Sequence, residues 1–238
     1  MNDVARTASP STRTRRARTG VAVGLVCLAV AGAAYAVRRP LMMSAPRCAA
    51  GRWHGCFDTF NGVVLMTLVA LPLSALLVCA LTWWRRRHGV DAAGRLSSAE
   101  VGMVHGAVPF LWLTMMPGAG VGVAPARVSL VPLRDLVTMG PLGIVGNLLV
   151  FASLGFFAPM RFRALASAPR ILALGAGCSV LVEVSQSVFR LDRVSSVDDV
   201  LLNATGALLA GLASRPWWRG DTRRARAEAD RPTPVATG

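Results

Sequence analysis

Residues 171–189 form a block of nineteen residues that contains one formal charge, Glu183. Its length is close to the roughly 20 apolar residues that a helix needs to cross a bilayer. A carboxylate near the middle of such a helix costs about 2.5–3.5 kcal/mol to insert, so it should face protein or water and not lipid. We therefore expect a membrane protein in which helices pack around buried polar side chains.

Similar apolar blocks recur along the chain. Hydrophobic residues make up 53% of the 238 residues and charged residues only 16%. This composition predicts an all-α fold, a polytopic transmembrane helical bundle of about six spans. The expected spans are residues 20–37, 59–84, 100–116, 141–159, 171–189 and 200–214.

The spans divide the chain into four expected parts. The first span follows a basic segment and also fits a signal peptide. We favour an uncleaved anchor because the apolar run is long and Arg38-Arg39-Pro40 is a poor cleavage context. The parts are a disordered basic cytoplasmic arm at 1–19, N-terminal transmembrane helices at 20–128, a transmembrane core at 129–218 and a disordered cytoplasmic tail at 219–238.

The arginines predict the orientation. With both termini in the cytoplasm, the inner segments carry 18 arginines and the outer segments 8, as the positive-inside rule requires. The net charge of +14 would suit nucleic-acid binding. We reject that function because the arginines gather at the ends of apolar blocks without an aromatic reading surface. We expect a multi-pass protein of the cell membrane, with membrane lipids as partners.

The five cysteines do not show the pattern of a disulfide framework. Cys48 and Cys56 flank a short polar loop that this orientation places outside the cell. A disulfide between them is possible there, and two free thiols are the alternative. The other three cysteines lie within apolar blocks, where cysteine is usually a small packed residue.

Polar residues in the last two spans line up on single helix faces. At 100° per residue, Ser179, Glu183 and Gln186 fall within about 60° of one another. In the following helix, Asp199 and Asn203 share a face. The predicted topology places these residues, together with Asn147 and Asp198, in the outer leaflet, and this convergence indicates a binding site.

Each candidate also has a structural interpretation. Asp198 and Asp199 fit helix capping behind Ser195 and Ser196. An intramembrane asparagine, such as Asn147 or Asn203, commonly links helices. Arg193 could pair with the aspartates or contact an anionic ligand. No metal-binding, nucleophile or phosphate-loop motif is present, so we expect no metal and no cofactor.

At these residues the chain resembles the VanZ-like family of membrane proteins over residues 129–211. Ser129 stands where the family usually has Asn, Ser153 where it usually has Pro, and Ser196 where it usually has the first Asp of its acidic element. The residues that carry the resemblance are Pro132; Asn147, Phe151, Leu154, Gly155 and Phe156; Ser179, Glu183 and Gln186; and Arg193, Asp198, Asp199, Asn203 and Gly206.

The resemblance implies a cell-envelope role linked to teicoplanin resistance, without an established reaction. One hypothesis is a polar pocket that binds a cell-wall precursor or another lipid-linked group. A second is an intramembrane enzyme acting on a lipid headgroup, with Glu183 as general acid/base and Asp198 or Asp199 as its partner. A third is a purely structural cluster. The expected binding residues are Asn147, Ser179, Glu183, Gln186, Arg193, Asp198, Asp199 and Asn203.

The orientation can be tested by cysteine-accessibility labelling in whole cells. We expect single cysteines placed in residues 85–98 to be protected from an impermeant reagent and those in 190–197 to be labelled. The opposite pattern would remove the shared outer-leaflet position of the candidate residues.

Overall fold

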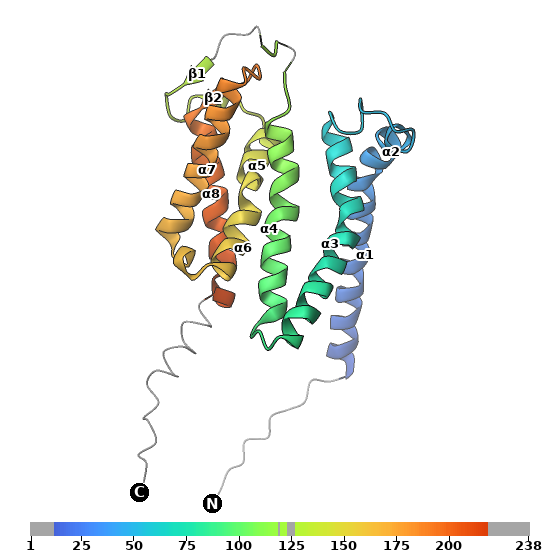
Figure 1. The fold of residues 1–238 in the computed structure, drawn as a ribbon. Coiled ribbons are helices and arrows are strands. Elements are labelled where there is room, and N and C mark those ends of the chain that lie inside the picture. The colour runs from blue at the N-terminus through green and yellow to red at the C-terminus, as the bar shows by residue number, and fades with distance from the viewer. Residues whose placement is uncertain (1–11, 119, 123–126, 219–238) are drawn as a thin grey trace, which may run out of the picture. The chain divides into compact units, whose positions relative to one another are not determined.

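The computed structural model describes residues 12–118, 120–122 and 127–218 (Figure 1). The chain divides into two compact units, with the boundary between Leu65 and Met66. Most of the predicted basic arm and all of the predicted tail lie outside the described residues.

The first unit contains α1 (Thr12–Met43), α2 (Ala45–Ala49) and the start of α3 (Phe60–Arg87). Helix α1 begins within the expected basic arm and continues beyond the expected end of the first span. The loop between α2 and α3 is closed by a disulfide between Cys48 and Cys56. The structure thus adopts the first of the two alternatives that the sequence left open for this pair.

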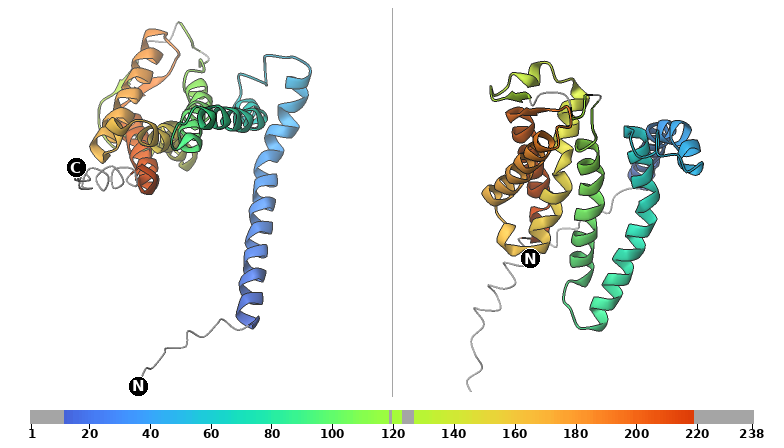
Figure 2. Two further views of the ribbon diagram at one scale, coloured as in Figure 1. Left: turned by 60° about the horizontal axis from the view of Figure 1, so that its bottom comes forward. Right: turned by 45° about the horizontal axis from the view of Figure 1, so that its top comes forward.

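The second unit is a bundle of helices that run side by side (Figures 1 and 2). Helix α8 is the common neighbour, because it packs against α5, α6 and α7, while α4 packs against α6. Besides the rest of α3, its helices are α4 (Ala93–Thr114), α5 (Pro141–Val150), α6 (Ala152–Arg161), α7 (Ala168–Val188) and α8 (Val197–Ala213), with the 3-10 turns η1 (Asp135–Val137) and η2 (Arg163–Leu165).

Three segments of the described chain are long and apolar enough to cross a membrane. They are α3, the pair α5–α6 taken together as Pro141–Arg161, and α7, with mean hydropathies of 2.6, 1.8 and 1.6. The helical character of the chain is therefore confirmed and these three segments are candidate membrane spans, whereas six spans remain a prediction. Helix α8 has 17 residues, in keeping with the short last span that the sequence indicates.

The expected fourth span, residues 141–159, is interrupted. Helices α5 and α6 meet at Phe151, which has φ −110° and ψ 14°. The Phe151 side chain is 2% exposed and packs with Val150, Ile171 and Ala207 in the core of the unit. This core places the break against α7 and α8.

Loops from two distant parts of the chain join at one end of the bundle. Strand β1 (Arg127–Ser129) pairs in parallel with β2 (Val194–Ser196). The Gly118 N–H also donates to the Leu191 carbonyl oxygen at 2.9 Å, and the Gly122 N–H to that of Arg190 at 2.8 Å. We call these joined loops, residues 115–140 and 189–196, the cap. The sequence predicts loops here, and the two strands form only where these distant segments meet.

The opposite end of the bundle is held by charge. The Glu100 carboxylate of α4 accepts hydrogen bonds from Arg85 of α3 and Arg161 of α6. Ser97, one turn earlier in α4, is fully buried and accepts a 2.9 Å hydrogen bond from Arg85. Ion pairs between three helices thus fix the end that the sequence assigns to the cytoplasm.

Helix α8 approaches its neighbours through glycine. A Cβ atom at Gly206 would collide with the Leu148 carbonyl oxygen of α5, and one at Gly155 of α6 would collide with the Ala207 carbonyl oxygen of α8. Small residues at such positions allow two helix backbones to approach closely, which is how membrane helices gain packing energy.

We expect Gly155→Ala to destabilise the bundle, because its methyl group would meet backbone that cannot move aside. Overpacking of this kind costs about 1–3 kcal/mol. Gly177→Ala in α7 is the matched control, since nothing lies within 4 Å of the added atom, and it should be neutral or stabilising. Thermal unfolding in detergent measures both, and equal melting temperatures would contradict the close approach.

Candidate functional site

Asp198 connects the cap to the bundle. It lies in the first turn of α8 and is fully buried. Its carboxylate accepts the backbone N–H groups of Leu133, Asp135 and Leu136 at 2.6, 2.8 and 3.3 Å. Leu133 has a φ of +66°, a strained conformation for a side chain other than glycine. Asp198 therefore joins this loop to α8, and its partners lie in a different loop from the one that the capping pattern indicates.

Ser196 caps α8 and makes a second connection to the same loop. Its hydroxyl oxygen accepts the Asp198 N–H at 3.2 Å, and the hydroxyl donates to the Asp135 carboxylate at 2.6 Å. The hydrogen bond from Ser196 lowers the pKa of Asp135 below its usual value, so Asp135 is ionised at neutral pH. Ser196 thus links the start of α8 to a carboxylate from another segment.

Asp199 points toward α5. Its Oδ1 atom accepts a hydrogen bond from Asn147 Nδ2 at 2.6 Å. Both side chains are partly buried. This bond joins the first turn of α8 to the middle of α5.

Glu183 of α7 is half-buried next to the start of α8. Its carboxyl group lies beside the Ser195 hydroxyl, the Ser196 N–H and the Asp199 carboxylate. The Oε2 atom is buried and has no hydrogen-bond partner within the described chain. Glu183 and Asp199 thus bring two carboxyl groups together from neighbouring helices.

Asn203 continues this arrangement one turn deeper in α8. Its Nδ2 atom donates to the Ser179 hydroxyl of α7 at 2.8 Å, and both side chains are buried. The Asn203 Oδ1 atom is buried and, among the residues described, has no hydrogen-bond partner. We define the polar cluster as the five residues that α5, α7 and α8 bring together in this way: Asn147, Ser179, Glu183, Asp199 and Asn203.

Gln186 and Arg193 point to another neighbour, the segment that follows α4. Gln186 Nε2 donates to the Thr114 carbonyl oxygen at 2.8 Å. The Arg193 guanidinium donates to the Met116 carbonyl oxygen at 3.2 and 3.4 Å and forms no ion pair with Asp198 or Asp199. Gln186 thus ties α7 to the end of α4, and Arg193 joins the two loops of the cap. The expected neutralisation of the aspartates by Arg193 is not seen as a direct contact.

Sequence reasoning missed two polar residues that support the site. Asp135 accepts from Ser196, and the hydroxyl of Ser187 lies 2.9 Å from that of Ser195. Asp135 carried no signal of its own, because it follows Arg134 in a loop with no helical or strand pattern.

The polar cluster is rich in hydrogen-bond acceptors. It presents the unpaired Oε2 of Glu183, the unpaired Oδ1 of Asn203 and the carboxylate of Asp199. In the described part of the chain, no group of three or more His, Cys, Asp or Glu residues is placed to hold a metal ion. The arrangement can accept hydrogen bonds from a ligand or exchange a proton with one.

A model of the VanZ/LLP1 family matches residues 73–218. The match covers more than half of the chain and includes the polar cluster, the cap and the whole bundle from α4 to α8. No curated protein and no solved structure matches the chain significantly.

Asp198→Asn should destabilise the protein far more than Asp199→Asn. The amide introduced by the first variant would turn an NH2 group toward backbone N–H donors, and each hydrogen bond to a charged group contributes about 1.5–3 kcal/mol. In Asp199→Asn the side-chain oxygen can still accept from Asn147. Thermal unfolding of the two variants tests this, and equal losses would show that Asp198 does not hold the cap.

Proposed function

Because this chain belongs to the VanZ/LLP1 family of membrane proteins, we propose that the polar cluster binds a lipid-linked or cell-wall-related group. Binding takes place in the outer leaflet of the cell membrane. It changes the access of glycopeptide antibiotics such as teicoplanin to their target.

The observation that carries this proposal is the pair of unpaired acceptors on adjacent helices. Glu183 Oε2 and Asn203 Oδ1 are both buried without a partner in the part of the chain described. A buried polar atom left unpaired costs roughly 1–3 kcal/mol. If the polar cluster were purely structural, both atoms would be expected to have hydrogen-bond partners within the protein. The Asp198 carboxylate does have such partners, in the loop at 133–136.

The same atoms define the chemistry of the ligand. Acceptors call for a ligand that carries hydrogen-bond donors, such as the hydroxyl groups of a sugar or the ammonium group of a lipid headgroup. The saccharide of a lipid-linked cell-wall precursor carries many hydroxyl groups close to the membrane surface. Such a headgroup would suit a site at the outer end of α7 and α8.

Two independent features support an outer location. The arginine distribution favours cytoplasmic termini, which places the loops at 38–58 and 190–197 outside. The disulfide between Cys48 and Cys56 lies in the first of these loops, and disulfides persist in oxidising compartments outside the cytoplasm.

The proximity of Glu183 and Asp199 favours a second candidate, an intramembrane enzyme acting on a lipid headgroup. Glu183 would act as general acid/base, since a carboxyl group in an apolar setting can hold or release a proton near neutral pH. Asp199 would be its partner, because the Asp198 carboxylate is occupied by three backbone N–H groups.

Glu183→Gln tests the proposal against a structural role. The amide keeps the size of the side chain and removes its ionisable proton, so we expect unchanged expression and melting temperature. Loss of co-purified envelope lipid, measured by lipid mass spectrometry, and loss of any effect on teicoplanin susceptibility should accompany it. Full retention of both at normal abundance would exclude the charged-site and enzyme proposals.

Glu100→Gln is the matched control for this experiment. Glu100 is paired with Arg85 and Arg161 at the other end of the bundle. Its replacement should lower the melting temperature without a selective loss of bound lipid. If Glu183→Gln instead behaves like Glu100→Gln, the polar cluster is structural.

A further inference from the structure

The loop between α2 and α3 contains a second polar site, which lies outside the residues matched by the family model. It borders a cavity of about 680 Å³ that is open to solvent, whose lining includes Arg47, Arg52, Trp53, His54 and Asp58. We propose that this loop cavity binds a phosphate group through Arg47 and Arg52.

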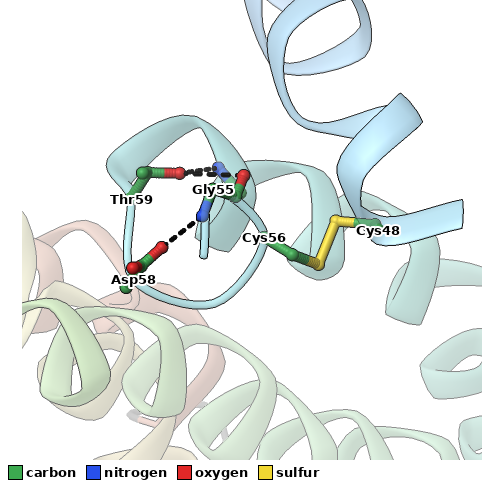
Figure 3. Close-up of a disulfide and its surroundings, with 6 residues drawn as sticks. Cys48, Gly55, Cys56, Asp58 and Thr59 are labelled. Carbon is green, nitrogen blue, oxygen red and sulfur yellow. Dashed lines mark hydrogen bonds between the residues drawn. A yellow bond between two sulfur atoms is a disulfide. The ribbon is translucent and has the colours of Figure 1, made fainter. Parts of the chain in front are cut away.

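The backbone around the loop cavity is held without the side chain of either arginine. The disulfide joins Cys48 to Cys56, and Cys56 is 1% exposed (Figure 3). The Thr59 hydroxyl donates to the Gly55 carbonyl oxygen and accepts the Gly62 N–H, both at 3.2 Å. The loop is therefore rigid before a ligand arrives, which lowers the entropy cost of binding.

Glycine at position 55 provides the space in which the Arg47 side chain lies. Gly55 is buried and has a φ of +83°, a conformation that favours glycine. A Cβ atom there would collide with Cδ and Nη1 of Arg47. The Arg47 guanidinium therefore packs directly over the loop backbone, at the edge of the cavity.

The two guanidinium groups are free to bind an anion. Arg47 and Arg52 are exposed, and neither forms an ion pair within the described residues. Each carries five N–H donors in a planar fork that matches the oxygens of a phosphate. Two guanidinium groups without an ion pair in the described chain, placed at one rigid cavity, form the arrangement that recognises a phosphate group.

The carboxylate in the lining does not neutralise these arginines. Asp58 accepts hydrogen bonds from His54 Nδ1 at 2.7 Å and from the Gly55 N–H. The hydrogen bond from His54 lowers the pKa of Asp58 below its usual value, so Asp58 remains ionised. Its two oxygens are engaged by His54 and by the Gly55 N–H. Asp58 thus orients His54 and leaves the two arginines for the ligand.

The charge of the segment from the end of α1 to the start of α3 supports an external anion. Residues 38–58 carry Arg38, Arg39, Arg47 and Arg52, half of the 8 arginines assigned to the outer side. Arginine is disfavoured in outer loops, and a bound anion offsets this charge. Trp53 is 56% exposed and suits the headgroup region. The phosphate therefore belongs either to an anionic lipid headgroup or to a soluble phosphate ester.

Binding is tested on the full chain in detergent by calorimetric titration, with short-chain phosphatidylglycerol in one arm and glycerol phosphate in the other. Arg47→Gln/Arg52→Gln should weaken binding about tenfold, as expected for lost charge-assisted hydrogen bonds. Arg38→Gln/Arg39→Gln removes the same charge from residues that do not line the cavity and should weaken binding less than about twofold. Binding in both arms identifies the phosphate ester as sufficient, and binding of the lipid alone identifies the headgroup as the source.

Equal losses of binding affinity in the two double variants would show that the arginines act only through general charge attraction, and would overturn the proposal. Absence of binding in both arms would also overturn it. Gly55→Ala provides a second test that leaves every charge in place. Its methyl group displaces the Arg47 side chain, so binding should weaken several-fold while thiol labelling shows the disulfide intact. Unchanged affinity in Gly55→Ala would show that the cavity does not position Arg47, and would also overturn the proposal.

Discussion

The buried carboxylate of Asp198 is the interaction on which the candidate site depends. A charge in the interior is tolerated only when its oxygens are fully hydrogen-bonded, and here three backbone N–H groups of one loop meet this need. The loop is thereby fixed against the first turn of α8. Because Ser196 and Asp199 flank Asp198, the same contact sets the positions of the Ser196–Asp135 and Asp199–Asn147 hydrogen bonds.

Close helix packing provides the second constraint. Polar side chains on neighbouring helices can bond directly only if the helix axes approach closely, and glycines at 155, 175 and 206 make this possible. Gly175 lies against Ala204 and Ala207 of α8, one turn from the Ser179–Asn203 bond. The polar cluster and the small-residue contacts are therefore two consequences of the same geometry between α7 and α8.

The two ends of the bundle use charge differently. At the end assigned to the cytoplasm, Glu100 is paired with two arginines and has an evident structural role. At the cap, the carboxylates of Asp135, Asp198 and Asp199 are matched by N–H, hydroxyl and amide donors and form no ion pair among the described residues. The carboxylates near the cap are thus held by neutral donors, whereas the carboxylate at the other end is held by arginines.

Much of the architecture was predictable from local pattern alone. Apolar blocks of bilayer length, together with arginines at their ends, determine the helical and membrane-embedded character, because these properties depend on composition within about twenty residues. Helical periodicity placed Ser179 and Glu183 on one face, and both do point toward α8. Family motifs identified Asn147, Asp199 and Asn203, which the fold brings together with them.

Only the tertiary structure decided which polar groups pair. Asp198 and Asp199 are adjacent and chemically identical, yet one binds backbone 62 to 65 residues away in the chain and the other binds Asn147. Gln186 lies on the predicted polar face but turns to Thr114, because the end of α4 lies beside it. Such contacts depend on how helices and loops pack in three dimensions, which no local pattern of residues encodes.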